Sequence, residues 1–384
     1  MKNLTILSYA NFNGLNGAAG FVKLFFDNKE QFKKNGINLI IHSNSTSFQN
    51  ESKYRKSVKF KIKNFIKILL NKTAFGRIRK FHYYLNVLGL KPVQLITDAQ
   101  LNNGIIILND MYVAYHYFKK YENKYKTVFM MHNNGDMLSM MNPANDKKIY
   151  DELKIIKDVI VSNTSCFVFV SEKGRANFIK IHPDKKDACI VINIGIKNPQ
   201  IHKIIRDYSS LHLVSVGNIS KRKNQIAILR ALKAINDPSI TLTLVGGEKI
   251  EDGRECSEYI LKERLTRQVF LAGSQEDVTP FLMDANAFIM TSFDEGLPIS
   301  AQEAMSYKLP LIMTDVGGCS ELIEGNGYLI TPNETEIVNA IRSFNNQLDK
   351  LQEMGECSYR IFLEKYTLEK MIEHYINLVH NSFL

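Results

Sequence analysis

The sequence predicts an α/β protein built from two Rossmann-like domains of similar size. Short apolar runs rich in β-branched residues alternate along the whole chain with amphipathic stretches of helix length, which is typical of parallel sheets covered by helices. The chain has 384 residues, whereas single cores usually stop growing near ~250 to 300 residues. A polar stretch with Gly, Pro and Ser at 195–210 divides the pattern in two, so we expect an interdomain linker there.

The strands of both predicted domains are continuously apolar rather than alternating, which indicates sheets buried on both faces. In the first domain, residues 1–200, we expect strands at Leu4–Leu7, Asn38–Ile41, Gly104–Leu108, Thr127–Met131, Cys166–Val170 and Ala188–Ile192. In the second, residues 201–365, we expect them at Leu211–Val216, Thr241–Val245, Val269–Leu271, Ala287–Met290 and Leu309–Met313. The remaining residues, 366–384, have the pattern of an amphipathic helix, and packing back on the N-terminal domain is one possible arrangement.

Composition narrows the class of protein without choosing a function. Lys and Arg number 49 against 39 Asp and Glu, a formal charge of +10, so we expect an anionic partner: nucleic acid, a membrane surface or a phosphorylated ligand. The five cysteines are scattered and form no C-x-x-C pair, which argues against a disulfide framework or a structural zinc site. Neither a signal peptide nor a membrane-spanning apolar run is found, so we expect a cytoplasmic protein.

The positive charge is concentrated in one segment, residues 52–91. This segment holds twelve basic residues and no Asp or Glu, so the rest of the chain is close to neutral. Apolar side chains such as Phe65, Ile66 and Leu69 are interleaved with the lysines at spacings that a helix could sort onto one face. One interpretation is an insertion with a solvated basic face; we favour binding to an anionic membrane or ligand.

The most informative stretch is Phe293–Met313, FDEGLPISAQEAMSYKLPLIM. Glu295 and Glu303 are separated by seven residues, and a Gly-Pro turn lies between a predicted strand and a helix that we expect to begin at Ser300. A helix N-terminus after such a turn presents unpaired backbone N–H groups and a positive dipole end, which favours phosphate. The pattern therefore predicts a phosphosugar or nucleotide pocket, although a capped helix with two solvent-facing glutamates would show the same spacing.

This stretch resembles the donor-binding signature of the retaining GT-B glycosyltransferases of family 4, the glycosyl transferases group 1. E-G-L-P, E-A-M, a strand and G-G follow one another, and SVGNISKRKNQIAILRAL, LTLVGG, VFLAG and DANAFIMTS precede them in the order of the family. The resemblance implies two domains facing each other across a cleft. It also implies a nucleotide-sugar donor, UDP- or GDP-linked, in the C-terminal domain, no other cofactor, and a glycan acceptor in the N-terminal domain.

By the same resemblance, Lys223 falls on the lysine that clamps the donor diphosphate. Arg222 could supply a second cation, because Asn218 stands where many members carry arginine; both could instead be surface charges at a βα turn. Glu303 would hold the ribose hydroxyls, Glu295 would contact the sugar ring, and Gly273 would face the base. Backbone groups reaching the phosphates and sugar would come from Gly296, Leu297, Pro298, Ile299 and Ser300.

The N-terminal half resembles the family more weakly. Gly14, Gly17 and Gly20 resemble the glycine loop that approaches the sugar and diphosphate from across the cleft, and the segment IIHSNS lacks the acidic residue that a dinucleotide would need. His132 stands where family members place a histidine facing the donor sugar, although a histidine at a strand end is as often structural. Asp110 and Glu172 occupy comparable loop positions and could face the acceptor, without support from a motif.

We therefore expect a retaining, metal-independent hexosyltransferase of bacterial surface polysaccharide biosynthesis, with Glu295, His132 and Lys223 at the reaction centre. No D-x-D triplet that could hold a metal occurs in the chain, so no metal-binding residue is assigned. The acceptor is expected to be a lipid-linked glycan, with residues 52–91 docking on the inner face of the cell membrane. The alternatives are a GT-B epimerase or phosphorylase, and an RNA-binding protein, which would leave the C-terminal motifs unexplained.

Overall fold

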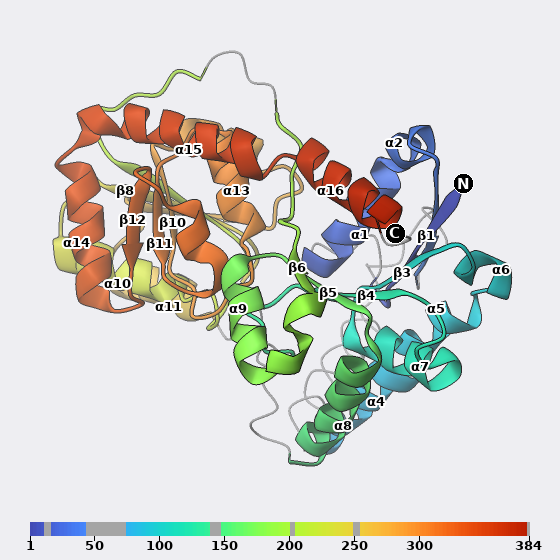
Figure 1. Ribbon diagram of the computed structural model, residues 1–384. Coiled ribbons are helices and arrows are strands. Elements are labelled where there is room, and N and C mark those ends of the chain that lie inside the picture. The colour runs from blue at the N-terminus through green and yellow to red at the C-terminus, as the bar shows by residue number, and fades with distance from the viewer. Residues whose placement is uncertain (11–16, 44–73, 139–146, 200–203, 249–253, 382–384) are drawn as a thin grey trace, which may run out of the picture.

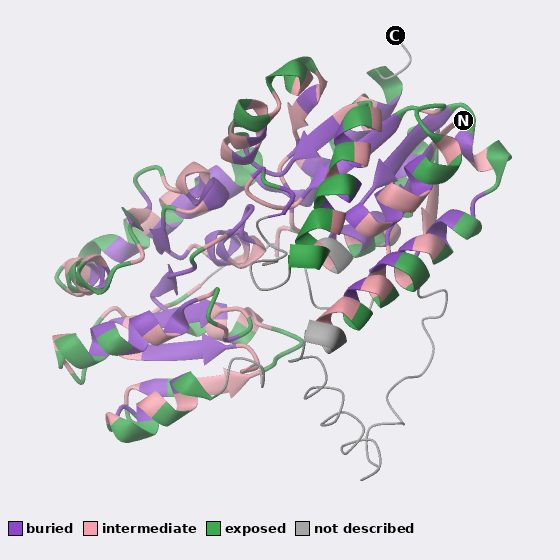
Figure 2. Cartoon of the chain, turned by 90° about the horizontal axis from the view of Figure 1, so that it is seen from below, coloured by how far each residue is buried: buried purple, intermediate pink, exposed green. Residues whose placement is uncertain are grey.

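The computed structural model describes residues 1–10, 17–43, 74–138, 147–199, 204–248 and 254–381, and the structural statements below refer to these. Two six-stranded parallel sheets, each flanked by helices, lie side by side (Figure 1). The predicted fold class is confirmed. Figure 2 shows buried residues along both sheets and on the inner helix faces, with exposed residues on the outer helix faces.

The N-terminal sheet has the strand order β2-β1-β3-β4-β5-β6, with all neighbours parallel. Every residue of β3 and β4 is buried, as their continuous hydrophobicity predicts. Because the chain moves from β1 to β2 on one side and then to β3 on the other, the order reverses beside β1. The strands are β1 Lys2–Leu7, β2 Ile37–His42, β3 Gly104–Leu108, β4 Thr127–Met131, β5 Cys166–Phe169 and β6 Cys189–Val191.

Two helices of the N-terminal domain begin at capping residues that lie two positions after the preceding strand. Asp110 Oδ1 accepts from Val113 N at the start of α7, and Ser171 Oγ accepts from Gly174 N at the start of α9. The elements are α1 Gly17–Asp27, α2 Lys29–Lys34, α4 Ala74–Tyr83, a π-helix Tyr84–Gly89, α5 Leu90–Gln94, α6 Asp98–Leu101, α7 Met111–Tyr121, α8 Lys147–Asn163, α9 Glu172–Ile181 and a 3₁₀ helix Pro183–Ala188.

The C-terminal sheet has the order β12-β11-β10-β7-β8-β9, again parallel throughout. In chain order within the domain this is 3-2-1-4-5-6 read from β9, the order of dinucleotide-binding Rossmann folds. The strands are β7 His212–Val216, β8 Thr241–Val245, β9 Val269–Gly273, β10 Ala287–Met290, β11 Leu311–Thr314 and β12 Gly327–Ile330. The eleven predicted strands are all present; β12, a short edge strand, was not predicted.

The helices of the C-terminal domain follow the same alternation. Arg206, within the predicted linker, donates to the carbonyls of Leu282, Ala285 and Tyr307, so the end of the linker is bound to this domain. The elements are α10 Gln225–Ile235, α11 Glu255–Lys262, α12 Thr279–Asp284, α13 Ile299–Ser306, the 3₁₀ helix η6 Gly317–Leu322, α14 Glu334–Asn345, a 3₁₀ turn Leu348–Lys350 and α15 Leu351–Lys365.

The chain crosses between the domains twice at one place. Ile196 N donates to Tyr366 O at 3.0 Å, and Leu368 N donates to Ile196 O at 2.8 Å. The last helix, α16 Leu368–Asn381, then packs on the N-terminal domain, where the Tyr375 ring lies edge-on to Phe25 (Figure 1). No helix in the described part of the chain has the length and hydropathy to cross a membrane.

Candidate active site

The basic loop, residues 217–224 between β7 and α10, meets the segment from Glu295 to Glu303 at the carboxyl edge of the C-terminal sheet. The strand order reverses between β7 and β10, and in open α/β sheets ligands bind outside the carboxyl ends of the strands at such a point. Phe293 N donates to Arg222 O at 2.8 Å, and Thr291 Oγ1 donates to Asn224 O at 2.9 Å. The fold therefore joins two loops about seventy residues apart at the position expected of a ligand site.

Lys223 and Glu295 form a largely buried ion pair at this junction. Lys223 Nζ lies 2.6 Å from Glu295 Oε1, and Arg222 Nη1 lies 3.3 Å from the same oxygen. The Glu295 side chain is only 8% exposed and that of Lys223 16%, whereas that of Arg222 is 41% exposed. Arg222 also donates to the carbonyl of Asp294. Two cations and one carboxylate thus share the edge of the site.

Helix α13 begins directly after the loop that carries Glu295. The helix begins at Ile299, one residue before the predicted start, and Pro298 at its N-cap makes no side-chain capping hydrogen bond. Among the described residues, no acceptor pairs with the backbone N–H of Ile299 or Ser300. Pro298 has no N–H group, so its predicted backbone contact with phosphate can come only through neighbouring amides. The free amides form a place for an anion.

Glu303 lies one turn further along α13. Burial raises the pKa of its carboxyl to about 7. Within the described part of the chain, no hydrogen bond or ion pair of this carboxyl is found, whereas its backbone carbonyl accepts from Ser306 Oγ. A partly desolvated carboxyl without a partner is a natural acceptor for ligand hydroxyl groups.

Glycines lie at the carboxyl ends of three neighbouring strands, β7, β8 and β9. Gly217, Gly246 and Gly273 have φ of +144°, +150° and +69°, which other residues rarely adopt. A Cβ on Gly246 would also lie 2.1 Å from Gly217 O, whereas the space around Gly273 is open. At the ends of β7, β8 and β9 the edge of the sheet therefore presents backbone rather than side chains. A glycine is required at position 273 by the positive φ and not by a lack of space for a side chain.

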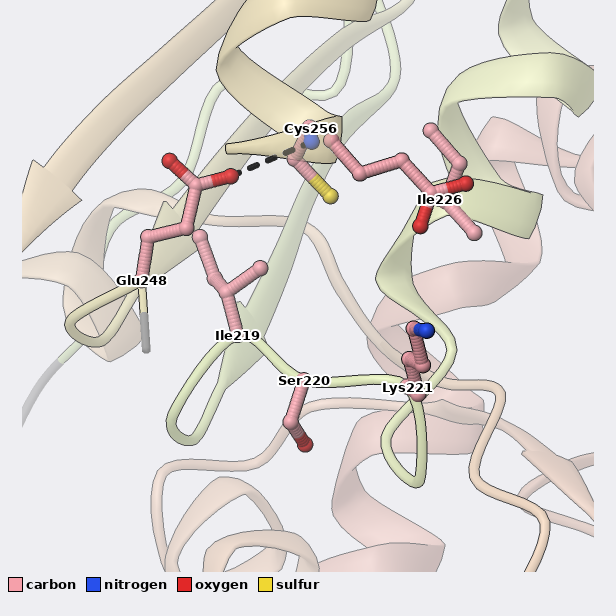
Figure 3. Close-up of a pocket in the computed structure, with 7 residues that line it drawn as sticks. Ile219, Ser220, Lys221, Ile226, Glu248 and Cys256 are labelled. Atoms are coloured by element: carbon pink, nitrogen blue, oxygen red, sulfur yellow. Dashed lines mark hydrogen bonds between the residues drawn. The ribbon is translucent and has the colours of Figure 1, made fainter. Parts of the chain in front are cut away.

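A small hollow lies beside the basic loop, between α10 and α11 (Figure 3). One of its lining residues, Glu248, accepts a hydrogen bond from Cys256 N at 3.1 Å and so caps α11. The lining residues are Ile219, Ser220, Lys221, Ile226, Glu248, Glu255 and Cys256. None of the residues predicted for the donor site lines this hollow.

His132 approaches the same region from the N-terminal domain. Its Nε2 lies 2.7 Å from Asn109 Oδ1, and Asn109 Nδ2 donates to Ser8 Oγ, so the ring donates through Nε2. Burial lowers the pKa of His132 to about 4, which keeps the imidazole neutral at neutral pH. Its Nδ1 is buried without a hydrogen-bond partner among the described residues. Asn109, which fixes this tautomer, was not predicted, although it directly follows a buried strand.

The loop of residues 291–298, between β10 and α13, is called the donor loop below, and it contacts His132 directly across the domain interface. A Cβ on Gly296 would lie 2.2 Å from His132 O, so only glycine fits between the two loops. Gly17 is the first residue of α1, while Gly14 and the rest of 11–16 lie outside the described residues. The structure thus brings His132 to the donor loop. It places Gly17 at the start of α1, and the predicted glycine loop before Gly17 lies outside the described residues.

Asp110 and Glu172 both have partners within the N-terminal domain. Asp110 accepts from Tyr9 N and Val113 N, both at 2.9 Å, and burial raises its pKa to about 6. The Glu172 side chain is exposed and pairs with Arg175 at 2.9 Å. Among the described residues, no cluster of three or more His, Cys, Asp or Glu side chains could hold a metal ion.

Comparison with known proteins identifies the family that the C-terminal domain matches. Residues 199–360, the C-terminal domain, match the family model described as Glycosyl transferases group 1. An O-antigen biosynthesis glycosyltransferase of Escherichia coli is 27% identical over 197 residues, 48% of this chain and 54% of that protein. A UDP-Gal:alpha-D-GlcNAc-diphosphoundecaprenol alpha-1,3-galactosyltransferase of the same species is 28% identical over 141 residues, 35% and 36% of the two chains. The chain spans about half the length of the first curated relatives it matches.

The fold is also that of solved structures over the whole chain. HepE of Anabaena in complex with UDP-glucose superposes with a TM-score of 0.70 at 16% identity, covering 100% of both chains. This similarity establishes the fold, two Rossmann-like domains in the GT-B arrangement.

Proposed function

We propose that this protein, whose C-terminal domain is a glycosyl transferases group 1 domain, is a retaining glycosyltransferase of the hexosyltransferase type. It would move a sugar from a UDP- or GDP-linked donor to a hydroxyl of a lipid-linked glycan acceptor in bacterial surface polysaccharide biosynthesis. The supporting names are those of relatives that build O-antigen or act on diphosphoundecaprenol-linked sugars. A solved structure with the same fold holds UDP-glucose.

The observation that carries this proposal is the meeting of Lys223 and Glu295 beside the N-terminus of α13 at the strand-order reversal. A diphosphate needs fixed cations and N–H donors that also stabilise the departing nucleotide. Lys223 has three N–H donors, so it can keep its contact with Glu295 while binding a phosphate oxygen. The free amides of Ile299 and Ser300 would share the negative charge, and Arg222 is close enough to contribute.

Glu303 and Glu295 would bind the ribose and the sugar of the donor, respectively. Glu303, which lacks a partner among the described residues, would accept hydrogen bonds from the ribose hydroxyls. Glu295 would position the sugar ring and stabilise the positive charge that develops on it. Gly273 and its backbone neighbours would lie along the base, where the absence of side chains leaves room for a planar ring.

In the proposed reaction the acceptor oxygen attacks the anomeric carbon from the face that the diphosphate leaves. The bond from the anomeric carbon to the phosphate oxygen breaks as the new glycosidic bond forms, and the acceptor proton passes to the departing phosphate oxygen. Configuration is therefore retained without a covalent enzyme intermediate. Neutral His132, through its unpaired Nδ1, would accept a hydrogen bond from a sugar hydroxyl and orient the ring. No step requires a metal ion.

A membrane location is proposed from the basic segment 52–91. Residues 52–73 lie outside the described residues. In the described part, Tyr83 and Val87 are about half exposed beside the exposed cations Arg79 and Lys80. Each Lys or Arg near an anionic membrane contributes about 1 kcal/mol, so a few would hold the protein at the inner face of the cell membrane. A lipid-linked acceptor would be reached from there.

Release of nucleoside diphosphate tests the function. Thermal-shift screening against UDP-, GDP- and ADP-sugars would first identify the donor, and the free diphosphate would then be measured with and without undecaprenyl-diphosphate-linked sugars. We expect release only when an acceptor is present. Conversion of the donor without an acceptor would point instead to an epimerase, and release of a sugar phosphate from a glycan to a phosphorylase.

A further inference from the structure

A carboxylate of the C-terminal domain completes the first turn of a helix in the N-terminal domain. Glu172 N donates to Glu321 Oε2 at 3.1 Å, and Lys173 N donates to Glu321 Oε1 at 2.9 Å. These are two of the backbone N–H groups that α9 leaves without partners inside the helix. Ser171 Oγ caps the helix at Gly174 N, so the N-terminal turn of α9 is satisfied jointly by its own domain and the other.

This contact has the features of a strong polar interaction. The negative carboxylate lies at the positive end of the helix dipole, and it accepts two charge-assisted hydrogen bonds. Lys173 Nζ adds an ion pair with Asp315 Oδ1 at 2.6 Å, but both side chains are more than a third exposed, so this pair contributes little. Glu321 therefore makes the main polar contact between α9 and the C-terminal domain at this point.

Glu321 belongs to η6, which is itself bound to the donor loop. Gly318 N donates to Gly296 O at 2.7 Å. A Cβ on Gly317 would lie 1.9 Å from Glu295 O, and one on Gly318 would lie 2.6 Å from Ser171 Cβ. The two glycines let η6 lie against the donor loop on one side and the cap of α9 on the other.

The same short helix also contacts the place where the chain crosses between domains. The hydroxyl of Tyr366, a buried side chain, donates to Glu321 O at 2.9 Å. Tyr366 O in turn accepts from Ile196 N at the crossing. Thus η6 contacts the donor loop, the N-terminal domain and the crossing between the domains at once.

From these contacts we infer that Glu321 is a positioning residue for the proposed transfer reaction: by capping α9 it holds the Glu295–Gly296 loop against His132. The inference rests on the proposed function. It does not require Glu321 to touch either substrate. Loss of the cap would leave the donor site within the C-terminal domain intact, while the position of the acceptor domain over that site would become less exact.

Substitution of Glu321 separates this role from donor binding. We expect Glu321→Ala to lower kcat/KM for the acceptor by about tenfold or more, because two hydrogen bonds to a charged carboxylate are lost, while the Kd of the donor nucleotide stays within about twofold. Glu321→Gln keeps an acceptor oxygen and should restore part of the activity. Glu324→Ala, which removes an exposed carboxylate three residues away, should match the wild type.

Amide hydrogen exchange of α9, measured on the same variants, gives a readout that does not depend on activity. We expect faster exchange at Glu172 and Lys173 in Glu321→Ala and near-normal exchange in Glu321→Gln. An active enzyme whose Glu321→Ala variant keeps full kcat/KM would overturn the inference, whatever its exchange. If the wild type has no transferase activity but α9 still exchanges faster in Glu321→Ala, the proposed function is wrong. The contact of Glu321 with α9 would then still be shown to hold the two domains together.

Discussion

Lys223 is the residue on which the proposed donor site depends most. It lies 2.6 Å from Glu295 and is only 16% exposed, so its charge is directed into the site. We expect Lys223→Ala to weaken binding of the donor diphosphate by at least about tenfold, because a charge-assisted hydrogen bond to phosphate is lost. Isothermal titration with the nucleoside diphosphate measures this.

The matched control for this variant is Lys221→Ala, since Lys221 is an exposed lysine of the same loop. It should bind the nucleotide like the wild type. Lys223→Ala should also lower the melting temperature, because Glu295 loses its nearest cation while remaining buried. Equal affinities for the two variants would remove Lys223 from the donor site.

Glu303 should make stability and donor binding depend on pH in opposite directions. The pKa of its carboxyl is about 7 in the folded protein against an ordinary value of 4.5, so the folded state binds more protons between these values. The free energy of unfolding therefore falls as pH rises from about 4.5 to about 7. Glu303→Gln should remove this loss and be more stable than the wild type at about pH 8, as chemical denaturation would measure.

Donor binding depends on the ionised form of the same carboxyl, which accepts ribose hydroxyls more strongly. We expect the donor Kd of the wild type to fall as pH rises through about 7 and that of Glu303→Gln to vary less over this range. The exposed Glu324→Gln should follow the wild type in both measurements. A parallel pH profile in wild type and Glu303→Gln would contradict the assignment.

At the scale of elements, the loop that carries Gly296 should tolerate no side chain. A Cβ there would lie 2.2 Å from His132 O, so Gly296→Ala must push the donor loop and the His132 loop apart. We expect a fall in kcat of about tenfold or more, with the C-terminal domain still binding nucleotide within a few-fold of the wild type. Steady-state kinetics and titration on the same preparation test this, and unchanged kcat would show that the contact is not needed.

Strands were predictable to within two residues of their ends because both faces of each sheet are buried, which produces continuous apolar runs. The apolar pattern predicts a start of β11 at Leu309, but the strand begins at Leu311, since Pro310 cannot donate to the ladder. The edge strand β12 was missed because only Ile330 of its four residues is buried.

Part of the candidate site was also accessible from sequence, because Lys223, Glu295 and Glu303 lie in short motifs whose order is informative. The contact of Glu321 with α9 was not. It joins residues 149 positions apart in the sequence, and a glutamate three residues after a glycine pair carries no local signal of a partner in another domain. The tautomer of His132 likewise depends on Asn109, which only the packing of β3 beside β4 brings near.

For the whole molecule, the uneven charge predicts where a membrane would bind. We expect binding to vesicles that contain anionic lipid and loss of that binding at high salt. Replacing Lys59, Lys61, Lys63 and Lys67 by Gln should weaken co-sedimentation about tenfold or more, because these lysines lie in the basic segment; they fall outside the described residues. Replacing Lys119, Lys120, Lys124 and Lys126, around the end of α7, should have little effect. Binding to RNA in place of vesicles would contradict the membrane proposal.

Transfer of the sugar with retention of configuration can be followed directly in one reaction. A labelled nucleotide-sugar identified by the thermal-shift screen is incubated with an undecaprenyl-diphosphate-linked sugar and an excess of EDTA, and the product is analysed by NMR. We predict a glycosidic bond with the anomeric configuration of the donor, formed at the same rate with and without the chelator. A product of inverted configuration, a reaction that stops on chelation, or a donor that is only hydrolysed would contradict the account.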